Sequence, residues 1–183
     1  VGMSSILIRS HESLSHLEQA GGADRLMMNL AEALRNVGWE VTILCPASRL
    51  DNEDSKHGLI TFNYLEPKNP VSKLVNSVRG VRKYQEILKN NSYDIVLDDV
   101  SHIPFYPLHF CSKDITNAIF LHTAFFNSAI NYNGIIRGSI VSLIDHTIPY
   151  LNSPEIICAS EGTEKRFQAR TGYNNTHILN PSI

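Results

Sequence analysis

The residues best suited to chemistry stand at the end of a predicted strand, residues 93–98. Asp98 and Asp99 lie at this end, and His102 follows three residues later. Open α/β folds bind ligands at the carboxyl ends of their strands, where a carboxylate or an imidazole can orient or deprotonate a hydroxyl group. Two carboxylates and one histidine are an incomplete, mixed ligand set. We therefore expect contact with a substrate hydroxyl group and no metal ion; a helix N-cap in a solvated loop is the alternative.

His122 ends a second predicted strand, residues 118–122. A polar ring directly after an apolar run stands at the same ligand-binding edge of a parallel sheet. We interpret His122 as a candidate functional residue. The alternative is a core histidine that is hydrogen-bonded to a backbone carbonyl.

Gly21 and Gly22 open a predicted helix that follows a strand at residues 6–8 and a polar loop. Glycine at a helix N-terminus lets a ligand phosphate approach free N–H groups and the positive end of the helix dipole. The G-x-G-x-x-G dinucleotide fingerprint is absent, so the pattern does not name the ligand, and relief of crowding at a turn is the alternative. Gly38 is expected to end the helix before a strand at 39–45. The apolar stripe of this helix comprises Met27, Leu30, Ala31, Leu34 and Val37.

A capped helix is predicted after a strand at residues 155–159. Ser160 is suited to the N-cap, Glu161 and Glu164 to the first turn, and Gly172 to the C-terminal end. Capping explains Ser160 without any further function.

A long helix is predicted at residues 70–91, and it has a basic side. Basic amphipathic helices dock on anionic membranes, with about 1 kcal/mol per basic residue near the surface. A solvated helix face is the alternative. The basic residues are Arg79, Arg82, Lys83 and Lys89, opposite an apolar stripe of Leu74, Val78, Val81 and Leu88.

Strands and helices alternate along the whole chain, with further strands predicted at 59–65 and 176–179 and helices at 104–113 and 134–151. Such alternation predicts an α/β, Rossmann-like, doubly wound parallel sheet of about six to seven strands with helices on both faces. The 183 residues suffice for one domain, which we place at 3–183 because the residues before Met3 resemble a tag remnant.

Composition narrows the function further. A net charge of −2 argues against nucleic acid as the main partner. Cys45, Cys111 and Cys158 form no C-x-x-C pair and indicate buried thiols in a reducing compartment. No apolar stretch is long enough to span a bilayer, and no secretion signal opens the chain. We expect a cytoplasmic protein.

Five segments resemble, in order and spacing, those of family 4 glycosyltransferases. The first is similar to the family's G-G-A-E, L-A-x-x-L and G-H-E-V-T-V-L run, and the others to Y-D-V-V, a strand ending in histidine, I-I-A-V-S-E-x-T and V-x-V-I-P-N-G-V. Departures are Asp24 for glutamate, Trp39 for histidine and Asn180-Pro181-Ser182 for proline-asparagine-glycine. The matching segments are residues 21–44, 93–96, 120–122, 156–163 and 177–183.

This resemblance implies a retaining enzyme of the two-domain GT-B fold that transfers a sugar from a nucleotide-sugar to a glycan or lipid-linked acceptor. The chain would be the N-terminal, acceptor-side domain. The C-terminal domain that binds the nucleotide-sugar would be absent, so the fragment alone is expected to be inactive. No metal or other cofactor is expected. In the family, the residue matching His122 faces the donor sugar near the reacting centre, and the one matching Glu161 faces the interdomain cleft.

The resemblance also implies a hexosyltransferase of cell-surface polysaccharide or glycolipid synthesis, located in the cytoplasm or peripherally at the inner face of the membrane. Two alternatives stay open. One is half of a nucleotide-sugar epimerase of similar fold. The other is a stand-alone Rossmann-like module that binds a nucleotide or a partner.

Overall fold

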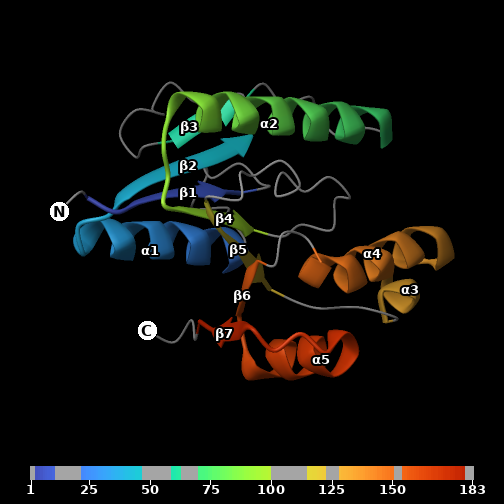
Figure 1. Ribbon diagram of the computed structural model, residues 1–183. Helices are drawn as coiled ribbons and strands as arrows, with labels where there is room; N and C mark the ends of the chain where they lie inside the picture. Colours follow the sequence, from blue (N-terminus) through green and yellow to red (C-terminus); the bar gives the residue numbers. More distant parts are fainter. Residues whose placement is uncertain are drawn as a thin grey trace. The chain divides into compact units, whose positions relative to one another are not determined.

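The computed structural model describes residues 3–10, 22–46, 59–62, 70–99, 115–122, 128–150 and 154–179. The chain divides into two compact units, Val1–Asp99 and Val100–Ile183 (Figure 1). Each unit is a parallel sheet with helices, and the described residues hold seven strands in all, four in the first unit and three in the second. The predicted α/β, Rossmann-like fold class is confirmed.

The first unit contains a four-stranded parallel sheet in the order β3-β2-β1-β4. Figure 1 shows α1 on one face of this sheet and α2 on the other, as a right-handed βαβ path requires. Apolar side chains of the strands form its core, among them Leu7, Ile8, Ile43, Leu44 and Leu97. The elements are β1 (Ser5–Arg9), α1 (Gly22–Asn36), β2 (Glu40–Pro46), β3 (Leu59–Phe62), α2 (Pro70–Asn90) and β4 (Ile95–Asp99).

Helix α1 ends as its sequence predicts. Gly38 adopts φ 90°, its N–H donates to the carbonyl of Arg35, and the N–H of Trp39 donates to that of Leu34. These two bonds are a Schellman motif, which a left-handed glycine permits. Met27 and Ala31 are fully buried as expected. The prediction was wrong for Val37, which lies beyond the helix and is 72% exposed.

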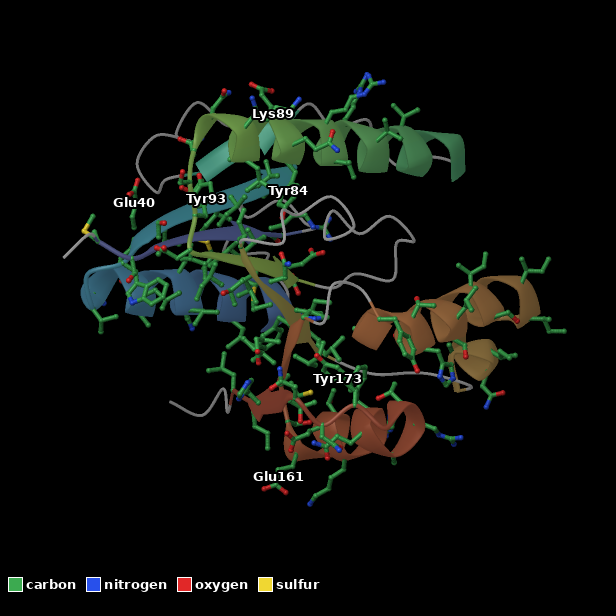
Figure 2. All side chains as sticks on the ribbon, viewed as in Figure 1. Glu40, Tyr84, Lys89, Tyr93, Glu161 and Tyr173 are labelled. Carbon is green, nitrogen blue, oxygen red and sulfur yellow. The ribbon has the colours of Figure 1, made fainter. Side chains whose placement is uncertain are left out.

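Helix α2 occupies the predicted range, but its buried face is different. Tyr84 and Ile87 are the large apolar side chains that α2 buries among its described residues, and Figure 2 shows Tyr84 directed toward the sheet. Val78, assigned to the apolar stripe, is 40% exposed. The aromatic ring provides more burial than a valine and therefore determines which face packs inward.

The second unit contains a three-stranded parallel sheet in the order β5-β6-β7. Helix α5 packs against β6 and β7, and α3 packs against α4. The elements are β5 (Thr116–Leu121), α3 (Ser128–Asn133), α4 (Ile135–Thr147), the 3₁₀-helix η3 (Ile148–Tyr150), β6 (Glu155–Cys158), α5 (Glu161–Thr171) and β7 (Thr176–Ile178).

The single helix predicted at 134–151 was wrong in detail. Gly134 adopts φ 76° and separates α3, which was not predicted, from α4. The two helices meet at Gly138, where an added β-carbon would lie 2.4 Å from the Cα of Ile130 and 2.6 Å from the carbonyl oxygen of Ala129. Only a residue without a side chain fits this contact.

Two of the three cysteines fall among the described residues. Cys45 and Cys158 are buried, as predicted, and burial raises the pKa of Cys158 to about 11. Among the described residues, no helix is both long and apolar enough to cross a membrane. Cys111, the predicted helix at 104–113 and the end of the strand at 59–65 lie outside the described residues.

Candidate functional site

In the first unit, the carboxyl edge of the sheet carries a partly buried ion pair. Arg9 and Asp98 are the last aligned residues of β1 and β4, and the Nε atom of Arg9 lies 2.5 Å from Oδ1 of Asp98. The Asp98 side chain is 1% exposed and that of Arg9 17%. A buried carboxylate is tolerated when a cation of good geometry compensates it. Arg9 was not singled out from the sequence, because its partner lies 89 residues away.

The acidic pair belongs to the strand and not to the loop after it. Asp98 and Asp99 are the last two residues of β4, and both are fully buried. A helix N-cap in a solvated loop, the alternative for this pair, is therefore wrong. Alternation along the strand places Asp99 on the opposite face of the sheet from Asp98. His102 lies outside the described residues.

Helix α1 begins at Gly22; Gly21 lies outside the described residues. In Figure 1, α1 begins at the end of the sheet to which the arrows of β1 and β2 point. The N-terminus of α1 and the Arg9–Asp98 pair therefore belong to the same edge of the unit. This edge combines the positive end of a helix dipole with a cation and a carboxylate.

In the second unit, the carboxyl edge brings His122 next to the start of α5. His122 directly follows β5 and is partly buried; its ring packs on Phe120, with the ring centroids 4.7 Å apart at an angle of 60°. The Oγ1 of Thr163, in the first turn of α5, donates to the carbonyl oxygen of His122 at 3.4 Å. The backbone of His122 is thus tied to α5, and its ring stands at the end of the strand, as predicted.

Ser160 acts as the predicted N-cap. Its Oγ accepts from the N–H of Thr163 at 3.2 Å, and its backbone is extended at φ −160°. At the other end of α5, Gly172 closes the helix at φ 71°. Thr163 was not singled out from the sequence. A hydroxyl residue three positions after an N-cap serine is the signal that marks it, because that position faces the cap.

Glu161 lies in the first turn of α5 and points into solvent (Figure 2). Its Oε2 is 3.0 Å from the Nζ of Lys165, and both side chains are at least 70% exposed. Surface pairs of this kind contribute little to stability. The structure therefore shows Glu161 in an ordinary surface ion pair; its expected role in a cleft stays a prediction.

A second polar cluster, at the other end of β6 and β7, was not predicted. Hydrogen bonds from Asn175 and then from His177 lower the pKa of Glu155, and His177 Nε2 lies 2.9 Å from the Glu155 carboxylate. Nearby, Thr176 Oγ1 donates to Glu164 at 2.7 Å, which ties β7 to α5. Glu155 begins β6, so this cluster lies at the amino edge, where parallel sheets do not bind ligands. We assign it a structural role.

The basic residues of α2 lie on its exposed side, as predicted. Arg79, Arg82 and Lys89 are exposed, and Figure 2 shows Lys89 pointing away from the sheet. Lys83 is less exposed and pairs with Glu86 at 3.0 Å. This basic face of α2, defined as Arg79, Arg82, Lys83 and Lys89, is accessible within its unit. In the described part of the chain, no three histidine, cysteine or acidic side chains are grouped so as to hold a metal ion.

The fold resembles that of several solved proteins. A glycosyltransferase from Rickettsia africae is 18% identical with a TM-score of 0.59, and the match covers 98% of this chain and 43% of that protein. The N-terminal domain of trehalose-6-phosphate phosphatase from Candida albicans is 10% identical with a TM-score of 0.62, over 98% of this chain and 48% of that one. The glycotransferase of kitacinnamycin is 14% identical with a TM-score of 0.52, and the match covers 86% of this chain and 46% of that protein. At these identities the likeness shows the fold alone.

This chain thus spans less than half of the length of each of these three solved proteins. No curated protein matches the sequence. The family model of Glycosyltransferase Family 4 matches residues 20–181, which is nearly the whole chain and includes the segments that carried the resemblance, apart from the last two residues of the final segment. The chain belongs to Glycosyltransferase Family 4.

Proposed function

We propose that this chain is the acceptor-side domain of an enzyme that transfers a sugar from a nucleotide-sugar donor to a glycan or lipid-linked acceptor. Membership of Glycosyltransferase Family 4 is the observation that carries the proposal. The polar groups at the carboxyl edges of both units support it, since these are the edges where α/β sheets bind substrates. We further propose that the donor nucleotide binds mainly to a second domain outside this chain.

Each edge offers groups of a suitable kind. The Asp98 carboxylate, held by Arg9, is suited to accept a hydrogen bond from a substrate hydroxyl. His122 presents a ring nitrogen at the end of β5, and we propose that it contacts the donor sugar. The start of α1 at Gly22 offers backbone N–H groups to the departing nucleotide diphosphate. Positioning and neutralisation of the leaving group then provide most of the catalysis, without a metal ion.

We propose a retaining hexosyltransferase in the synthesis of a cell-surface polysaccharide or glycolipid. The basic face of α2 supports a lipid-linked acceptor, because exposed basic side chains attract anionic headgroups. The protein would then act in the cytoplasm, docked peripherally on the inner face of the membrane.

The test is an assay of the full-length gene product against a panel of nucleotide-sugars, with free nucleoside diphosphate as the readout. Release that requires an added glycan or lipid-linked acceptor is the expected result. An epimerase would instead convert the donor sugar without an acceptor, and a binding module would bind the nucleotide without turnover. Either outcome would overturn the proposal. We expect no transfer by residues 1–183 alone.

A further inference from the structure

Arg9 uses only part of its hydrogen-bonding capacity inside the protein. Its Nε donates to Asp98, and no hydrogen bond or ion pair to the two terminal nitrogens, Nη1 and Nη2, occurs within the described residues. A guanidinium has five N–H donors, so four of them have no protein partner there. The side chain is nevertheless only 17% exposed, and buried donors without partners are costly.

Arg35, another arginine of the same unit, contacts a strand through a terminal nitrogen. Arg35 reaches from α1 to β2, where its Nη2 donates to the carbonyl oxygen of Val41 at 3.0 Å. Arg9 instead contacts Asp98, its partner on β4, through Nε. The Asp98 contact thus fixes the plane of the Arg9 guanidinium and leaves its terminal fork for another ligand.

One carboxylate, already paired with Nε of Arg9, and the N-terminus of α1 (Figure 1) lie at the same sheet edge as the terminal nitrogens of Arg9. Of the two acidic residues of β4, Asp98 shares the face of Arg9 and Asp99 lies on the opposite face, because side chains alternate along a strand. The N-terminus of α1 lies at the same edge (Figure 1) and adds the positive end of its dipole. A planar fork of donors matches the oxygen atoms of a phosphate group.

The geometry points to Arg9 as the residue that binds a phosphate group of the substrates through Nη1 and Nη2, with Asp98 as the residue that positions it. The phosphate group belongs either to the diphosphate of the donor or to a phosphorylated acceptor. These two sources rest on the proposed function, whereas the binding of a phosphate group by Arg9 does not. The assignment adds a phosphate-binding arginine that sequence spacing did not reveal.

The experiment is a calorimetric titration of the 183-residue chain with two probes. Pyrophosphate represents the donor's diphosphate, and glucose 6-phosphate represents a phosphorylated sugar acceptor. The test variant is Arg9→Lys, which keeps the positive charge. A lysine has one terminal nitrogen, so it cannot contact Asp98 and also present two further nitrogens to a phosphate group. Because Arg9→Gln alone would leave a buried carboxylate uncompensated, the neutral variant is the double substitution Arg9→Gln with Asp98→Asn. The matched control is Arg170→Gln, which removes an exposed arginine of α5.

We expect the unaltered chain to bind at least one of the two probes, and Arg170→Gln to bind that probe with the same affinity. Arg9→Lys should weaken binding by about tenfold or more, as expected for charge-assisted hydrogen bonds, and the double variant should abolish it. The probe that binds more tightly identifies the source of the phosphate. Equal affinity in Arg9→Lys, or no binding of either probe at millimolar concentration, would overturn the inference. Phosphate binding without sugar transfer by the full-length protein would overturn the proposed function and leave this inference standing.

Discussion

Replacing His122 with alanine separates a catalytic role from a packing role. In the chain, the ring contacts Phe120 at 4.7 Å and is partly buried. An aromatic contact of this kind contributes about 0.5–1.5 kcal/mol. The hydrogen bond from Thr163 is accepted by the backbone carbonyl and survives the substitution. We therefore expect the free energy of unfolding to fall by only about 1 kcal/mol.

The expected loss of activity is much larger. A positioned polar group that acts in the transition state contributes about 10²–10⁴-fold to the rate, which corresponds to about 3–5 kcal/mol. The assays are urea unfolding of the 183-residue chain and kcat/KM of the full-length protein with its donor and acceptor. The matched control is His177→Ala, which removes an exposed histidine at the amino edge and should leave transfer unchanged.

Two results would refute this reasoning. A loss of several kcal/mol in the unfolding free energy of His122→Ala is typical of a truncated core side chain, and it would identify His122 as a packed core residue. Transfer at the rate of the unaltered enzyme would remove His122 from the reaction altogether.

Three further variants test other parts of the structure. Gly22→Val should raise the KM for the donor without unfolding the chain, because a β-branched side chain obstructs phosphate approach at the start of α1; an unchanged KM would make Gly22 a simple connector. Charge reversal on the basic face of α2 is tested with the triple variant Arg79→Glu, Arg82→Glu and Lys83→Glu. This variant should cosediment less with anionic vesicles than the unaltered chain, and the difference should shrink as the salt concentration rises. Equal binding by the variant and the unaltered chain would mean that this face is merely solvated. Gly138→Ala should destabilise the chain by about 1–3 kcal/mol, because its β-carbon would overlap the backbone of α3. If Gly138→Ala unfolded at the same urea concentration as the unaltered chain, the result would contradict the close contact between α3 and α4.

Features determined by neighbouring residues could be predicted from the sequence. The Ser160 cap, and the glycine ends of two helices at Gly38 and Gly172, follow from local backbone chemistry, and the structure has all three. The alternation of strands and helices likewise follows from hydrophobic patterns of a few residues. These local signals were sufficient for the fold class.

Features determined by distant contacts could not be predicted. The face of α2 that packs inward depends on Tyr84 and on the surface opposite it, which periodicity does not describe. In α4, large apolar side chains are exposed, with Ile136 at 80% and Leu143 at 65%. The Arg9–Asp98 pair joins residues that are adjacent only after β1 and β4 align. Spacing in the sequence contains no signal for such a pair.

The most direct test of sugar transfer follows both products of the full-length protein in one reaction. Mass spectrometry of the acceptor and quantification of nucleoside diphosphate should show one sugar added for each diphosphate released, and neither product without acceptor. Diphosphate release that does not depend on acceptor, or an acceptor of unchanged mass across the donor panel, would contradict the assignment of this chain to a sugar-transferring enzyme.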